Sequence, residues 1–234
     1  IIIHSILYMF IKGDILDKLD EIDNDSIDLV FTSPPYWKGF GYESYFNSYL
    51  QYINWTKDWI KKIKPKIKQD GYFLLNMCND SITTIKAYEI LECCTANGFK
   101  LHDTIIWYKP NNQQTSTNKQ LANRYEFIFM LRHNSNNVNI HKEGIIEKYP
   151  DVFFDLKIVG NLWKIPFKIY KDSKLKKQHK TSKNHSGFPP VLCELVIDLF
   201  TEEEDTILDP FCGNFLLENI AQSKNRKIIG IDLN

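Results

Sequence analysis

The chain has 234 residues, 43% of them hydrophobic and 14% aromatic, which suits one sizeable globular domain and excludes a disordered chain. Its 29 basic and 29 acidic residues cancel, so the net charge gives no sign of a nucleic-acid binder. The five cysteines are scattered and never arranged as C-x-x-C, which argues against a disulfide framework or a zinc site and favours the reducing cytoplasm.

The first half of the chain is predicted to alternate strands and helices. The apolar opening, residues 1–11, is too short to span a bilayer and lacks the features of a signal peptide, so we interpret it as a buried strand and expect no membrane association. Apolar positions three or four apart predict a helix from about Glu43 to Lys64, which Pro65 ends. The remaining predicted elements are strands at 27–32, 71–77, 103–108 and 125–131 and a helix at 82–97.

The second half begins with a segment of weak periodicity. From Arg132 to about His185 the sequence is rich in Asn and Lys, which predicts a loop-rich insert outside the sheet. Nine lysines and one acid lie between Lys157 and Lys183, forming either a solvated loop or a surface that contacts phosphate. Further predicted elements are a helix at 189–200, a strand at 206–208, a helix ending near 223 and a strand at 227–231. The alternation indicates an α/β fold with a mostly parallel sheet.

A proline-rich turn follows the predicted strand at 27–32. Pro34 and Pro35 fix φ and lack an N–H, so the backbone there is stiff and offers carbonyl acceptors without donors. Ser33 adds a hydroxyl, and Tyr36 adds a flat ring. This combination suits a planar group that carries an NH2, although a structural turn with core aromatic residues gives the same pattern.

A second turn near the end of the chain has the layout of a nucleotide-binding site. The strand at 206–208 leads into Asp209-Pro210-Phe211-Cys212-Gly213, and a helix follows. About twenty residues later the last strand ends in Asp232. A glycine turn allows a ligand to approach the backbone, and a later carboxylate can accept hydrogen bonds from ribose hydroxyls.

Together these motifs resemble the amino-methyltransferases of DNA found in bacterial restriction–modification systems. Thr32–Tyr36 is similar to the catalytic loop of that family, Asp209–Gly213 to its S-adenosylmethionine loop and 230–234 to its ribose-binding strand end. Further matching segments are Gly13-Asp14, Trp107-Tyr108-Lys109-Pro110, Arg124-Tyr125-Glu126 and His185-Ser186-Gly187-Phe188-Pro189-Pro190. The catalytic motif precedes the cofactor motif, which is the circularly permuted order called the beta group.

The resemblance implies a Rossmann-like, mostly parallel sheet of seven strands with helices on both faces, circularly permuted and carrying a loop-rich target-recognition insert. The catalytic part would span 1–131, the target-recognition region 132–184 and the S-adenosylmethionine-binding part 185–234. Duplex DNA would be the substrate and a restriction endonuclease the functional partner, with the protein acting as a monomer or weak dimer. No metal is expected.

The resemblance also implies roles for individual residues. Ser33 and the Pro34 carbonyl would accept hydrogen bonds from the exocyclic amine of a flipped base, and Tyr36 would stack on that base. A serine at the first catalytic position leans toward cytosine N4, with adenine N6 as the alternative. The catalytic set is Ser33, Pro34, Pro35 and Tyr36; the cofactor-binding set is Asp14, Phe188, Pro189, Asp209, Phe211, Gly213, Asn214 and Asp232.

One departure from the family pattern leaves alternatives open. Phe215 stands where the family usually has glycine, so it either packs inward or blocks the cofactor. In the second case the chain would be a catalytically inactive DNA-binding relative. A methyltransferase acting on structured RNA or protein is a further alternative, which the permuted motif order disfavours.

Overall fold

The computed structural model describes residues 8–37, 45–78, 84–111, 121–133, 139–166, 187–213 and 216–233. Its strands are β1 (Tyr8–Lys12), β2 (Ile27–Thr32), β3 (Ile67–Cys78), β4 (Lys100–Tyr108), β5 (Tyr125–Arg132), β6 (Leu162–Lys164), β7 (Thr206–Asp209) and β8 (Lys227–Asp232). Its α-helices are α1 (Ile15–Lys18), α2 (Tyr49–Ile63), α3 (Thr84–Ala96), α4 (Ile145–Lys148), α6 (Pro190–Phe200) and α7 (Leu216–Ser223).

The strands form one sheet in the order β1-β8-β7-β2-β3-β5-β4-β6. The five strands from β1 to β3 in this order run parallel. β5 is antiparallel to both β3 and β4, and β6 is parallel to β4. The prediction of a mostly parallel, Rossmann-like α/β sheet is confirmed, but the sheet has eight strands rather than seven.

The additional strand, β6, lies in the segment that the sequence placed outside the sheet, so that expectation is wrong for Leu162–Lys164. Trp163 pairs with Trp107 of β4 and is only 2% exposed. The indole Nε1 of Trp107 donates to the Ile165 carbonyl at 2.8 Å. A three-residue strand is too short to show alternation, so only the buried tryptophan could have indicated it.

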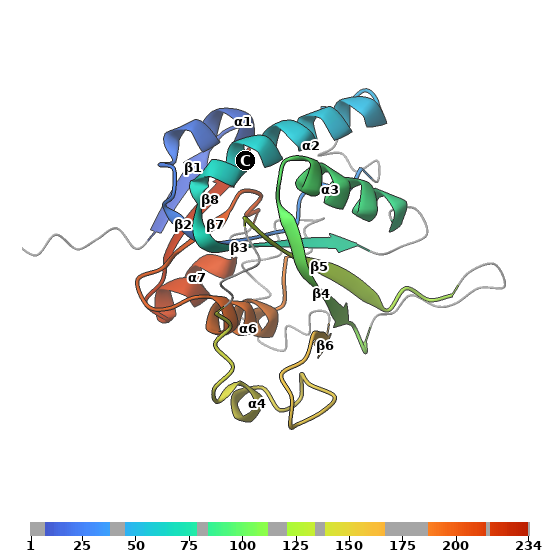
Figure 1. The fold of residues 1–234 in the computed structure, drawn as a ribbon, viewed down its shortest axis with the longest axis vertical. Helices are drawn as coiled ribbons and strands as arrows, with labels where there is room; N and C mark the ends of the chain where they lie inside the picture. Colours follow the sequence, from blue (N-terminus) through green and yellow to red (C-terminus); the bar gives the residue numbers. More distant parts are fainter. Residues whose placement is uncertain are drawn as a thin grey trace, which may run out of the picture.

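Helices cover both faces of the sheet, with α1, α2 and α3 on one face and α4, α6 and α7 on the other (Figure 1). The central strand β2 is buried on both faces: Leu29 and Phe31 pack with the α6 side, and Val30 packs with the α2 side. Burial on both faces explains why this strand is a continuous apolar run rather than an alternating one.

Helix boundaries differ from the sequence prediction at one end of α2. Ser48 is the N-cap, and its hydroxyl accepts from the Gln51 amide at 3.2 Å, so the helix begins at Tyr49. Residues 45–48 precede it as turn and bend, and the expected start at Glu43 lies outside the described residues. Among the described residues, no helix is both long and apolar enough to cross a membrane.

The first and last strands of the described chain are neighbours. β1 pairs with β8 in parallel, and the Gly13 amide donates to the Asp232 carbonyl at 2.9 Å. β7 and β8 therefore lie between β1 and β2 although they come last in the chain. This strand order is what the predicted circular permutation requires.

A largely buried carboxylate of α6 joins the C-terminal end of α4 to the residue that follows α7. Asp198 of α6 accepts from Lys148 of α4, Lys224 beyond α7 and the Tyr149 hydroxyl, each at 2.6 Å. Burial alone would raise the pKa of Asp198, but these hydrogen bonds outweigh burial and hold it below its usual value. The cluster therefore ties residues of the predicted target-recognition region to the C-terminal part.

We expect Asp198→Asn to lower the free energy of unfolding by about 2–3 kcal/mol, because an amide NH2 would face one of the two lysines. Urea unfolding measures this change. Glu204→Gln is the control, since the Glu204–Lys227 pair is exposed and should contribute less than about 1 kcal/mol. Equal destabilisation by the two variants would contradict the prediction.

Candidate active site

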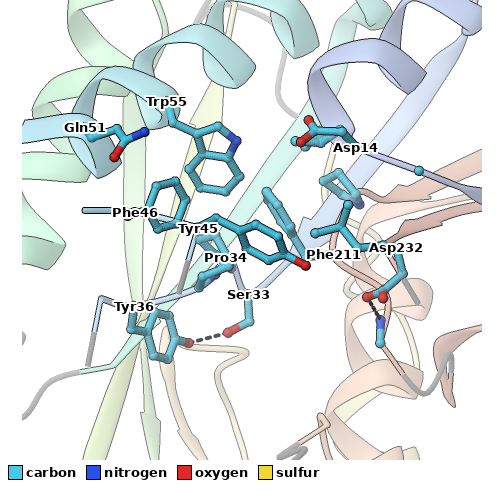
Figure 2. A pocket seen from close by; sticks show the side chains of 16 residues that line it. Asp14, Ser33, Pro34, Tyr36, Tyr45, Phe46, Gln51, Trp55, Phe211 and Asp232 are labelled. Carbon is cyan, nitrogen blue, oxygen red and sulfur yellow. Dashed lines mark hydrogen bonds between the residues drawn. The ribbon is translucent and has the colours of Figure 1, made fainter. Parts of the chain in front are cut away.

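Four loops meet at one edge of the sheet because β1, β8, β7 and β2 run parallel and end there. They enclose a cavity of about 360 Å³. Eight of the predicted site residues line this cavity: Asp14, Ser33, Pro34, Pro35, Tyr36, Phe211, Gly213 and Asp232. The predicted catalytic and cofactor motifs therefore converge on a single site, which Figure 2 shows from close by.

One end of the cavity carries two carboxylates, Asp14 after β1 and Asp232 at the end of β8 (Figure 2). Asp14 is the N-cap of α1 and accepts from the Leu16 amide at 2.8 Å. Asp232 Oδ2 accepts from the Gly213 amide at 3.0 Å. Gly213 has φ of 51°, a conformation that favours glycine, and this turn brings its amide to the carboxylate.

Asp209 lies behind the cavity rather than on its surface. Its Oδ1 accepts from the Thr32 hydroxyl at 2.7 Å and from the Phe211 amide at 3.2 Å. Thr32 ends β2 and Asp209 ends β7, so this carboxyl joins the catalytic loop to the cofactor loop. These contacts suit a residue that orients the two loops, and the predicted contact of Asp209 with the cofactor stays a prediction.

The loop after β2, which is the predicted catalytic loop, is held by one internal hydrogen bond and by hydrogen bonds to β3 and α2. Ser33 Oγ bonds to the Tyr36 hydroxyl, which also donates to Asn76 Oδ1 at 3.0 Å. Tyr52 of α2 donates to the Pro35 carbonyl at 2.7 Å. The loop leaves the site through Trp37, whose φ of 54° is unusual for a bulky residue.

Contacts to neighbouring elements hold this strained residue. Lys86 Nζ of α3 donates to the Trp37 carbonyl at 2.7 Å, and the Trp37 ring stacks on Tyr52 at 6.0 Å between centroids. Strain of this kind persists only where the surroundings enforce it, and it is common next to functional loops.

Aromatic side chains form the wall between the two ends of the cavity. Trp55 of α2 lies 5.6 Å from Phe211 and 5.0 Å from Phe46 between ring centroids, and Tyr45 lies beside them (Figure 2). Flat apolar walls suit the ring of a nucleoside. The sequence pattern predicted Tyr45 and Trp55 on the apolar face of a helix, because aromatic spacing alone does not distinguish a core from a cavity wall.

Of the twelve predicted site residues, Asp209, Phe188 and Pro189 do not line the cavity, and Asn214 is not described. Phe188 stacks on Phe31 at 4.2 Å, and Pro189 caps α6. Neither lines the cavity, so their predicted cofactor contacts remain predictions. Asn214 and Phe215 lie outside the described residues. No group of three metal-ligating side chains is present in the part of the chain that the structure describes.

A permuted Rossmann-like sheet with carboxylates, aromatic walls and an acceptor-rich proline loop in one cavity defines a protein that binds a nucleoside-containing cofactor beside its reaction loop. The family model described as DNA methylase matches residues 27–234. The chain therefore belongs to the DNA methylase family. Membership confirms the predicted resemblance and, with it, the use of S-adenosylmethionine.

Individual relatives include proteins that act on different bases. The chain is 25% identical to the DNA adenine methyltransferase YhdJ of Escherichia coli K12, over 96% of this chain and 78% of that protein. It is 27% identical to the type II methyltransferase M.HpaI of Haemophilus parainfluenzae, over 96% and 69%. The solved PvuII DNA methyltransferase (cytosine-N4-specific) superposes with a TM-score of 0.77 at 21% identity, covering 97% of this chain and 84% of that one.

The buried carboxyl of Asp209 predicts a pH dependence of stability. Burial raises its pKa to about 7, although hydrogen bonds from Thr32 and the Phe211 amide oppose the shift. The folded protein therefore holds a proton that the unfolded chain has released between about pH 4 and 7, and stability falls as the pH rises through that window. Above about pH 7 both states are ionised and the dependence ends.

We expect the difference in unfolding free energy between the wild type and Asp209→Asn to shrink as the pH rises from 5 to about 7, because Asn cannot ionise. Urea unfolding at several pH values measures this difference. A difference that stays constant across the window would show that the Asp209 carboxyl has an ordinary pKa.

Proposed function

We propose that this protein transfers a methyl group from S-adenosylmethionine to the exocyclic N4 of a flipped cytosine in duplex DNA. The observation that carries the proposal is that Ser33 and Pro34 line the same cavity as Asp14 and Asp232. An acceptor pair suited to an amine thus shares one cavity with carboxylates suited to ribose and adenine.

The described residues fit the cofactor. Asp232 would accept from ribose hydroxyls, Asp14 would meet the adenine edge, and Trp55 and Phe211 provide flat apolar walls for the rest of the ligand. When bound, S-adenosylmethionine would supply an electrophilic methyl group; the N–C bond would form as the S–C bond breaks, and the amine nitrogen would release one proton to water. The Gly213 turn, anchored on Asp232, brings the backbone close to the ligand.

The chain's own contribution to the reaction is to bind and orient the amine. The lone pair of an exocyclic amine is delocalised into the base ring, which makes it a poor nucleophile. Hydrogen bonds from its two hydrogens to Ser33 Oγ and the Pro34 carbonyl would draw the nitrogen toward tetrahedral geometry and aim the lone pair at the methyl group. Tyr36 would stack on the flipped base. Rate enhancement then comes from position and oriented dipoles.

Cytosine is proposed over adenine because serine occupies the first position of the catalytic turn. The comparisons support either base, since one relative is an adenine methyltransferase and one solved neighbour is cytosine-specific. The type II relative supports a functional partnership with a restriction endonuclease. A monomer would suffice, because each strand of a duplex can be methylated separately.

The target-recognition region is proposed to comprise residues 132–184. The structure describes residues 132–133 and 139–166 of this region, and the second range contributes β6 and the core residues Trp163 and Ile145. The lysine-rich sequence lies beyond residue 166. DNA contact by Lys164 and by lysines of 167–183 would follow from charge.

We expect nucleoside mass spectrometry of duplex DNA incubated with the protein and S-adenosylmethionine to detect N4-methylcytosine. Detection of N6-methyladenine would overturn the choice of base but keep the enzyme. If no methylated nucleoside forms while calorimetry shows that the cofactor binds, the inactive DNA-binding alternative would replace this proposal.

We expect Ser33→Ala to lower kcat by about a hundredfold, because one acceptor for the amine is lost, while cofactor affinity stays near the wild-type value. Single-turnover methylation and calorimetry measure the two quantities. An equal loss of cofactor affinity would contradict the role assigned to Ser33.

Asp232→Asn should weaken S-adenosylmethionine binding by about tenfold or more, because the remaining amide oxygen can hold the Gly213 amide but not the ribose as well. Isothermal titration calorimetry measures the affinity. Asp17→Asn removes an exposed carboxylate from α1 and is the control for general charge. Equal affinity in Asp232→Asn and wild type would exclude the ribose contact.

A further inference from the structure

We propose that Asn76 and Glu126 are positioning residues that set the direction of the Ser33 hydroxyl, so that its oxygen faces the target amine as an acceptor. The inference deepens the proposed function and rests on it. A serine hydroxyl can either donate or accept, whereas a donor amine requires an acceptor. The direction of the Ser33 hydrogen bond therefore matters for the reaction.

The chain of hydrogen bonds begins at a largely buried ion pair. Glu126 of β5 pairs with Lys109, and their side chains are 14% and 7% exposed. Lys109 Nζ also lies 4.2 Å from the centroid of the Trp107 ring. A carboxylate held by a lysine can only accept hydrogen bonds, so the group next to Glu126 in the series must donate to it.

The side-chain amide of Asn76 in β3 has one favourable orientation, which sets the direction of the next hydrogen bond. Its Nδ2 donates to Glu126 Oε2 at 3.1 Å and to the Phe127 carbonyl at 3.0 Å, both of which are acceptors. Its Oδ1 is thereby turned toward the Tyr36 hydroxyl at 3.0 Å. Antiparallel pairing of β3 with β5 places these groups together, and Asn76 is 2% exposed.

Tyr36 has one hydroxyl hydrogen, and two acceptors of Asn76 face it, Oδ1 at 3.0 Å and the backbone carbonyl at 3.3 Å. Burial, followed by the charge of Glu126, holds the pKa of Tyr36 well above its usual value, so the hydrogen is retained. The bond between Tyr36 and Ser33 must then run from Ser33 as donor to Tyr36 as acceptor. The opposite direction would leave two acceptor oxygens facing each other between Tyr36 and Asn76.

The result is a one-way series from Ser33 through Tyr36 and Asn76 to Glu126. Because the only hydrogen of the Ser33 hydroxyl points away from the substrate, the lone pairs of Oγ are left to accept from the amine. The Pro34 carbonyl, unlike the Ser33 hydroxyl, can only accept a hydrogen bond, so it needs no neighbouring groups to set its direction. The Lys109–Glu126 pair does not line the cavity, and in this proposal it sets the direction of the hydrogen bonds that reach Ser33.

The test changes which of residues 126 and 76 donates the hydrogen bond between them and which accepts it. In Glu126→Gln the amide oxygen is claimed by Lys109, so an NH2 faces Asn76, and Asn76 must turn its own NH2 toward Tyr36. Tyr36 then donates to Ser33, in competition with the Asn76 backbone carbonyl at 3.3 Å, and donation to Ser33 reverses the series. We expect kcat to fall about tenfold to a hundredfold, with cofactor affinity and KM for DNA near wild type.

The double variant Glu126→Gln with Asn76→Asp restores the direction. The carboxylate introduced at position 76 accepts both from the amide introduced at position 126 and from the Tyr36 hydroxyl. We expect its kcat to exceed that of either single variant, which a purely structural role would not produce. Loss of the bond to the Phe127 carbonyl makes the recovery incomplete.

Tyr36→Phe provides an independent arm, since it interrupts the series. Adding Glu126→Gln to Tyr36→Phe should then cause no further loss of kcat. Glu204→Gln, which breaks a lysine pair away from the cavity, is the matched control and should keep wild-type kcat.

Two outcomes separate the proposals. If the wild type methylates DNA and Glu126→Gln has the same kcat, or if the double variant is slower than both singles, the series is overturned and the proposed function stands. If the wild type binds S-adenosylmethionine but methylates no DNA, the proposed function fails, and this inference fails with it.

Discussion

The hydrogen bond from Thr32 to Asp209 is the contact on which the site depends. The two residues are 177 positions apart in the chain, yet each ends a central strand of the sheet, and the bond is buried. Asp209 also holds the Phe211 amide, so one carboxyl fixes the start of both functional loops. β2 and β7 pair through Leu29 with Ile207 and Val30 with Leu208, and this bond extends the connection to the start of the two loops. A second tie of the same kind joins Gly213 to Asp232 and fixes the other end of the cofactor loop.

Much of the fold and part of the site could be predicted because they depend on local sequence. Apolar runs that end in Ser33, Asp209 and Asp232 indicated parallel strands, and parallel strands end at one edge, so convergence of these residues followed. Strand β6 was missed because three residues show no periodicity. The roles of Trp55 and Phe46 as cavity walls were missed because an aromatic side chain has the same sequence pattern in a core. The contact of Asn76 with Glu126 joins residues 50 positions apart, and no local pattern reports it.

The segment between the two motifs is partly integrated into the domain. Residues 139–166 contribute a strand and several core side chains, and Asp198 bonds to Lys148 and Tyr149 from this segment. A region expected to read DNA is thus anchored on the same helix face that supports the cofactor loop. Its described part and the edge of the sheet that carries the cavity share one hydrophobic core.

The pairing of β1 with β8 determines when the protein can become functional during synthesis. The cavity is lined by Asp14 and Asp232, which leave the ribosome more than two hundred residues apart. β2 and β3 can pair while later strands are still missing, whereas the cavity closes only after β8 has been inserted between β1 and β7. Contacts between such distant residues slow folding. A nascent chain therefore carries the loop after β2 long before the cavity beside that loop is complete.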